Sequence, residues 1–267
     1  MAPTVPAPAH PARPRLPVAR SGMRYWARGY WRTLAWDLAD LRLQLPILAC
    51  VLILQGAGFV LGIGLFFRNI PPAAATFVVT GIPVVNLITA GLIFEPQIVA
   101  DQRAAGSYDF LQSMPAPRSM SAMAWYTVAL ITALPAVVLT LVAGVARYDL
   151  QLDITPAIVP AVLAVSLTGV LMGYAVAHAV TVPMIARLVS VSLIFVIFGF
   201  SPIMFPASQL PHWLSATNAW LPFESMATVI RSSLGGSASG VARAYVVVLV
   251  WAALSAVVTA RVVGHRR

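Results

Sequence analysis

The sequence predicts an all-α membrane protein with six transmembrane helices. Of its 267 residues, 60% are hydrophobic and only 9% are charged, whereas a soluble domain typically carries about 25% charged residues. The apolar residues fall in long blocks, and six of these blocks come close to the roughly 20 residues that a helix needs to cross a bilayer. The uneven distribution of arginine between the loops supports the same fold class.

The expected spans follow from stretches that lack Asp, Glu, Arg and Lys. They are placed at about 46–67, 74–94, 122–146, 157–182, 188–206 and 243–262. The charge-free stretch that begins at residue 188 runs on to residue 223 and is interrupted by Pro202, Pro206 and Pro211. Irregular backbone inside a bilayer is tolerated only where protein or water covers it, so we expect one helix there, followed by a short re-entrant external element.

The N-terminal 45 residues are interpreted as two segments outside the spans. Residues 1–22 are rich in Pro and Ala and lack an apolar core, which predicts a disordered cytoplasmic tail. In residues 23–45 aromatic side chains are interleaved with arginine, as is typical of an amphipathic helix in the headgroup layer. The alternative is that the first span already begins at Trp36. Residues 46–262 then form the six-span domain and 263–267 a cytoplasmic tail.

All 17 basic residues are arginine, and their distribution between the loops predicts the orientation of the chain in the membrane. With six spans, 13 arginines fall on the side of the two termini and four on the other side. Loops rich in basic residues stay in the cytoplasm, so both termini are expected there. The lack of lysine beside abundant alanine suggests a GC-rich bacterial genome, and hence a bacterial plasma membrane protein. The net charge of +9 is interpreted as a topology signal that faces membrane lipids, not as nucleic-acid binding.

The composition argues against chemistry carried by this chain. A Walker A loop needs a lysine, and the sequence has none. The eight carboxylates are scattered along the chain, so no catalytic residue, no metal site and no cofactor on this chain are expected. The single cysteine, Cys50, lies in an apolar run and is expected to be a small buried residue.

The loop after the second span combines charges with a short apolar face. Its polar and helix-breaking residues are Glu95, Asp101, Arg103, Gly106, Asp109 and Pro115. A helix over roughly 97–113 at the membrane surface fits this pattern, although Gly106 weakens its middle. A solvated connector is the alternative.

This loop resembles the segment that follows the second span in the ABC-2 permease family of ATP-binding-cassette transporters. The family pattern E-x-E-x-x-x-G-T-x-x-x-L-x-x-x-P is similar to the run of Glu95, the cluster from Asp101 to Arg103, Gly106, Phe110, Leu111 and Pro115. Ser107 stands where Thr is usual, and Asp-Gln-Arg replaces the commoner Glu-Arg-Glu. The resemblance implies a cytoplasmic coupling helix here, between spans two and three, that docks on an ATPase subunit.

A second and more specific match follows the fifth span. The family's spaced pattern of Pro, Phe, Leu, Trp and Arg is matched by Pro202, Phe205, Pro206, Leu210, Pro211, Trp213, Leu214, Pro222 and Arg231. The resemblance implies short re-entrant external helices at this position. Glu224 would lie two turns from Arg231 on one helix face, and the pair is interpreted as structural and interfacial rather than as a substrate contact.

Four residues inside the spans are candidates for a substrate pathway. Gln55 and Asn86 are polar within the first two spans, and Phe59 and Phe198 are aromatic. Ordinary helix–helix packing is the alternative for all four.

The six spans and the two motifs together favour the permease subunit of an ABC exporter. It would work as two permease chains, a homodimer or a related heterodimer, with two copies of an ATPase subunit that binds ATP and Mg. Resemblance to antibiotic-resistance permeases implies a hydrophobic or amphiphilic substrate, drug-like or lipid-like; a glycolipid or polysaccharide is the alternative. A membrane-embedded lipid-modifying enzyme and a simple channel are the rival classes, and neither clustered carboxylates nor a filter-like motif favours them.

Overall fold

A computed structural model describes residues 22–66, 70–107, 118–180, 182–204, 206, 210–236 and 239–264. The regular secondary structure of these residues is entirely helical. The helices are α1 (Met23–Asp40), α2 (Gln44–Phe66), α3 (Pro72–Ile88), the π-helix η1 (Thr89–Ile93), α4 (Phe94–Ala104), α6 (Arg118–Tyr148), α7 (Ile158–Ala179), α8 (Pro183–Phe200), α9 (His212–Asn218), α10 (Pro222–Ser233) and α11 (Val241–Gly264).

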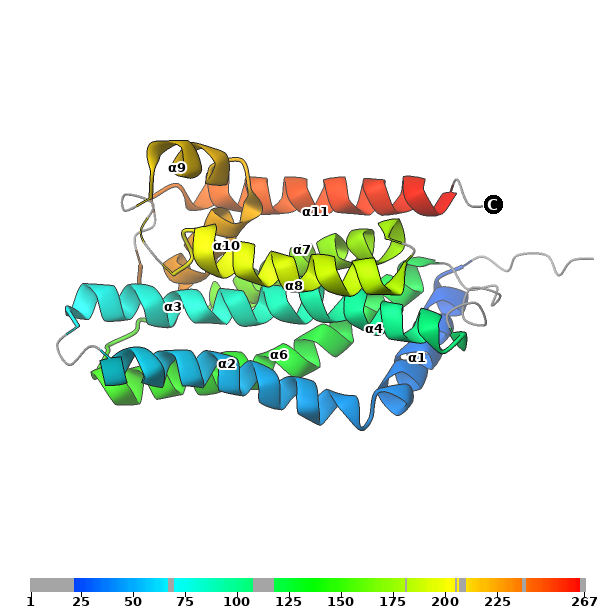
Figure 1. The fold of residues 1–267 in the computed structure, drawn as a ribbon, viewed down its shortest axis with the longest axis horizontal. Helices are drawn as coiled ribbons and strands as arrows, with labels where there is room; N and C mark the ends of the chain where they lie inside the picture. Colours follow the sequence, from blue (N-terminus) through cyan, green and yellow to red (C-terminus); the bar gives the residue numbers. More distant parts are fainter. Residues whose placement is uncertain are drawn as a thin grey trace, which may run out of the picture.

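Six helical segments are long and apolar enough to cross a membrane. They are Gln44–Leu65, Pro72–Ala104, Ser119–Tyr148, Ile158–Ala179, Pro183–Phe200 and Val241–Arg261. The prediction of an all-α chain with six such segments is confirmed, and each overlaps one expected span. The segments run along the long axis of the molecule, with α1 and the C-terminal turns of α11 at one end and α9 at the other (Figure 1). We call these the α1 end and the α9 end.

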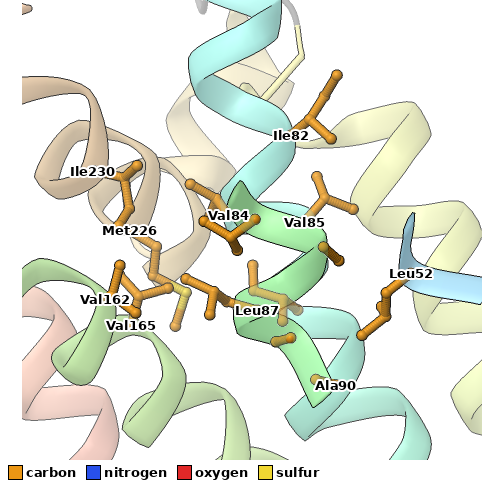
Figure 2. Packing of buried hydrophobic residues seen from close by; sticks show 14 of the residues in the cluster. Leu52, Ile82, Val84, Val85, Leu87, Ala90, Val162, Val165, Met226 and Ile230 are labelled. Carbon is orange, nitrogen blue, oxygen red and sulfur yellow. The ribbon is translucent and has the colours of Figure 1, made fainter. Parts of the chain in front are cut away.

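The segment formed by α3, η1 and α4 is the centre of the bundle. Its most apolar window is 83% buried, against 17% for α8 and 22% for both α2 and α11. Figure 2 shows side chains of α3, among them Val84, Val85 and Leu87, packed against residues of α2, α7 and α10. Many exposed side chains of the outer helices are large and apolar, Phe195 of α8 among them, which suits contact with lipid.

The central helix runs well beyond the expected end of the second span at residue 94. It continues through the π-helical turn η1 into α4 and ends at Ala104. Pro96 explains the position of this turn, because a proline ring clashes with the carbonyl four residues earlier, here that of Leu92 within η1. The widened turn therefore lets the helix continue past a residue that would otherwise break or kink it.

The helix expected over 97–113 has different bounds. It begins at Phe94 as a continuation of the span and stops at Ala104. Gly106 ends it, because this residue adopts a φ of 75° and its N–H bonds to the Arg103 carbonyl at 3.2 Å, as in a left-handed helix cap.

Prolines fix several other helix starts. Pro72, Pro183 and Pro222 each stand in the first turn of a helix, where no N–H partner is lost. Val182 is extended because it precedes Pro183, so α8 begins five residues before the expected start of the fifth span.

The expected burial of Cys50 is wrong, because its side chain is exposed on the outer face of α2.

Helix α1 lies against α6. Trp26 donates to Ser119 at 3.1 Å, the Tyr30 and Thr127 hydroxyls lie 2.8 Å apart, and Leu34 is buried. The helix ends at Asp40, and α2 starts at Gln44 after a turn. The first candidate span therefore starts after this turn and not at Trp36.

Candidate functional site

The charged end of α4 is attached to the corner between α7 and α8. Asp101 forms an ion pair with Arg187 in the second turn of α8, and both side chains are about half exposed. Arg103 donates to the backbone carbonyl of Val180, the C-cap residue of α7. Two of the predicted coupling residues therefore contact one corner of the bundle at the α1 end, from a helix that is continuous with the core.

A third contact from the same turn reaches α1. Gln102 donates to Asp40, the last residue of α1, at 3.5 Å. Three successive residues thus link α4 to α1, α7 and α8. Sequence reasoning did not identify Arg187, Val180 or Asp40; the one available signal was that Arg187 is the only charged residue between the expected fourth and fifth spans.

Glu95 lies deep inside the bundle at the start of α4. It is 2% exposed, its Oε2 atom has no hydrogen-bond partner among the described residues, and the Asp37 carboxyl of α1 lies close enough to act on it electrostatically. Burial, and then the neighbouring Asp40, raise the pKa of Asp37 to about 7. Glu95 is therefore enclosed by helices of the same chain. The predicted coupling residues Phe110, Leu111 and Pro115 lie outside the described residues.

Two amide side chains link three helices in the middle of the bundle. Gln55 of α2 donates to Thr89 of η1 at 3.2 Å, and Asn86 of α3 donates to Thr140 of α6 at 3.3 Å. Asn86 is fully buried, and its Oδ1 atom has no partner. Gly56 is required here because a Cβ atom would lie 2.0 Å from the Thr140 hydroxyl. Contacts of this kind are typical of helix–helix packing, which is the alternative to a substrate pathway at these positions.

The two aromatic pathway candidates meet. The rings of Phe59 on α2 and Phe198 on α8 have centroids 6.0 Å apart and are tilted by 46°. Both side chains are half-buried. They bring together two outer helices that flank the central one (Figure 1).

At the α9 end, the second motif forms two short helices. Pro202 is buried directly after α8, Pro206 and Leu210 are partly buried, and Pro211 is the exposed N-cap of α9. Trp213 is 67% exposed on α9, and Pro222 is buried at the start of α10. Phe205 lies outside the described residues.

Arg231 of α10 binds backbone oxygens. Its Nη2 donates to the carbonyls of Phe77, at 3.3 Å, and Ile203, and its Cζ lies 3.6 Å from the centroid of the Phe77 ring. Burial lowers the pKa of Arg231 to about 10, and Glu224 opposes this fall. The expected pair with Glu224 therefore acts through space, whereas the direct partners of the guanidinium are carbonyls, which leave no mark in a sequence.

The polar side chains of the candidate site contact other helices of the same chain. Within the described ranges, no group of three or more His, Cys, Asp or Glu side chains could hold a metal ion. The polar contacts instead fasten helices together at both ends and in the middle. No known protein-family model matches the chain, and no curated protein sequence matches it either.

Proposed function

We propose that this chain is the transmembrane subunit of an ABC-2 type exporter, with ATP hydrolysis on a separate ATPase subunit. Two such chains, identical or related, would combine with two ATPase copies that hold ATP and Mg. The proposal is carried by the attachment of the charged end of α4 to the α7–α8 corner. This is the segment that resembles the coupling region of the family.

The attachment suits the transmission of force from a partner. A displacement of Asp101 and Arg103 acts on α8 through Arg187 and on the core through the continuous helix of α4, η1 and α3. The ion pair is half exposed, and such pairs contribute about 0–1 kcal/mol. A link of this strength can break and re-form in every transport cycle.

In this proposal the α1 end is cytoplasmic and α1 lies in the headgroup layer. The distribution of arginine and the 65% exposure of Trp31 favour this placement. The α9–α10 segment then forms the external re-entrant element. The substrate is a hydrophobic or amphiphilic molecule, drug-like or lipid-like, because the outer faces of the bundle and the contact between Phe59 and Phe198 are apolar.

The first test concerns the missing energy source. The gene beside that of this chain should encode an ATPase with a Walker A lysine, and the two proteins should co-purify from membranes. The complex in lipid vesicles should hydrolyse ATP and export an amphiphilic dye. Robust ATP hydrolysis by the purified chain alone would refute the proposal.

The second test uses the ion pair. Asp101→Arg and Arg187→Asp each place like charges together, so each should uncouple export from ATP hydrolysis, while the double variant restores the pair and should regain export. Arg243→Asp is the matched control, because Arg243 is exposed in the first turn of α11, where an acidic residue is favourable. If the double variant exports no better than the single variants, the pair does not couple α4 to α8.

A further inference from the structure

The backbone at the end of α8 creates a demand for hydrogen-bond donors. The helix stops at Phe200, and Ser201 turns into the extended conformation with ψ of 140°. The last carbonyls of a helix have no partner within it, and in lipid or a packed core each must find another donor. Residues 201–204, which follow the helix, are all buried.

Asn218, at the end of α9, supplies the first donor. Its Nδ2 donates to the Phe200 carbonyl at 2.7 Å and to the Leu214 carbonyl within α9 at 3.0 Å. Asn218 is 3% exposed. One amide group therefore ties α9 to the end of α8.

Arg231, on α10, supplies the second hydrogen-bond donor. It donates to the carbonyls of Ile203, after α8, and Phe77, on α3. The close approach depends on Gly81 of α3, where a Cβ atom would lie 2.4 Å from the Ile203 oxygen and 3.1 Å from Nη2 of Arg231. One guanidinium thus joins three segments that are far apart in the chain.

These bonds have the properties of a reversible closure. The pKa of Arg231 remains near 10, so the side chain is charged at neutral pH. It is bound to neutral carbonyls, Glu224 acts on it only through space, and its buried Nε has no partner. A buried charge is costly unless other groups compensate it, and here backbone carbonyls are the groups that bind it directly. The contact is specific in geometry, because one Nη2 atom serves carbonyls of two segments.

Helix α8 is also the element best placed to move. It is the least buried of the six candidate spans, and its closest helical neighbours are α4 and η1. An arginine secures it at each end: Arg187 bonds it to Asp101 of α4, and Arg231 bonds the segment that follows it to α3. A shift of α8 at one end must therefore strain the contact at the other.

We propose that Asn218 and Arg231 form a carbonyl latch, defined by their bonds to the carbonyls of Phe200, Ile203 and Phe77, which keeps the α9 end of the bundle closed and opens when α8 moves. Both are positioning residues that act on the end of α8. The role of this opening in release of an amphiphilic substrate rests on the proposed function. The closure itself rests only on the geometry of the α9 end.

Cysteine labelling tests the latch. Ser201 is buried next to the latch and its hydroxyl has no partner, so Ser201→Cys is a nearly isosteric reporter. Cys50 is the only native cysteine, and Cys50→Ser removes it. The full-length chain in lipid vesicles is treated with a charged methanethiosulfonate reagent, and the rate of modification of the reporter is measured.

Arg231→Gln and Asn218→Ala should each raise the labelling rate by at least about tenfold, the factor that 1.4 kcal/mol produces. Arg231→Lys keeps the charge and one donor direction and should give an intermediate rate. Arg243→Gln, which removes an exposed arginine, should leave the rate unchanged. The melting temperature of each variant, read in parallel, distinguishes a folded open state from unfolding, and Asn218→Ala serves if Arg231→Gln does not fold.

Unchanged labelling in folded Arg231→Gln and Asn218→Ala would overturn the latch, and so would an equal rise in Arg243→Gln. The labelling needs no ATPase, so its outcome is separate from that of the proposed function. If the chain pairs with no ATPase, the exporter proposal is refuted and the latch proposal is not affected. Unchanged labelling would refute the latch even where ATPase coupling is found.

Discussion

The backbone crossing between Gly91 of η1 and Gly173 of α7 gives the sharpest stability prediction. A Cβ atom added at Gly173 would lie 2.1 Å from the Gly91 carbonyl oxygen and 2.9 Å from the Gly91 carbonyl carbon. Ordinary van der Waals contact begins at 3.4 Å. To restore that distance between the new Cβ atom and the Gly91 oxygen, which would otherwise lie 2.1 Å apart, α7 would have to move away by about 1.3 Å. Both sides of the contact are helix backbone, so no side chain can rotate out of the way.

Gly173→Ala is therefore expected to lower the free energy of unfolding by about 1–3 kcal/mol, the usual cost of forcing extra carbon into a packed interior. Gly58→Ala on α2 is the matched control, because a Cβ atom there meets nothing within 4 Å. Replacing a helical glycine by alanine without a clash should raise stability by up to about 1 kcal/mol. The two variants should thus shift stability in opposite directions.

The measurement is a thermal melt of the purified chain in detergent, followed by tryptophan fluorescence and by the fraction that stays monodisperse on size exclusion. The Tm of Gly173→Ala should fall below that of the parent, and the Tm of Gly58→Ala should equal or exceed it. Equal Tm values for the two variants would show that the α7–η1 crossing is not a backbone contact, and the reasoning from close approach would fail.

Three further predictions concern the same bundle. Gly56→Ala should cost about 1–3 kcal/mol, and its combination with Thr140→Ala should cost less than the sum of the two single changes in a double-mutant cycle, because the clashing hydroxyl is gone. Tyr148→Phe removes a 2.7 Å bond from α6 to the Val60 carbonyl on α2 and should cost about 0.5–1.5 kcal/mol in the same melts. The raised pKa of Asp37, about 7 against 3.8, means that the folded chain binds this proton more tightly than the unfolded chain, so stability should fall as the pH rises from about 4 to 7. Asp37→Asn should flatten that fall, and an unchanged pH profile would contradict the assignment.

The sequence was sufficient for the number and approximate position of the apolar helices, because length and hydropathy decide which segments can sit in lipid. It was not sufficient for the bounds of the second segment. The charged residues from Glu95 to Arg103 suggested that the span ends and a separate helix follows. The structure instead carries the helix through η1 to Ala104 and buries Glu95 against α1. A buried carboxyl and a π-helical turn before a proline have no periodic signature that hydropathy could reveal.

The sequence singled out several charged residues but could not show which groups they contact. Asp101, Arg103 and Arg231 were all identified, yet two of the three bind backbone carbonyls, and the third binds an arginine that no motif marked. A carbonyl is present at every position of a chain, so a sequence cannot show which one a side chain will reach. The interpretation of Glu224 and Arg231 as a pair followed from helical spacing and missed the carbonyls that Arg231 binds.

The two arginines that secure α8, Arg187 and Arg231, face different chemical demands. A guanidinium presents five donors in a planar fork, so Arg231 can serve carbonyls from two segments at once and still lie over the Phe77 ring. An ammonium group is compact and strongly hydrated, and it loses the stacking contact. At Arg187 the partner found among the described residues is one half-exposed carboxylate, so a lysine should serve there nearly as well. Arg187→Lys should therefore keep the coupling between α4 and α8, whereas Arg231→Lys should leave the α9 end partly open. Equal effects of the two changes would show that the exposed ion pair and the buried carbonyl latch do not differ in this way.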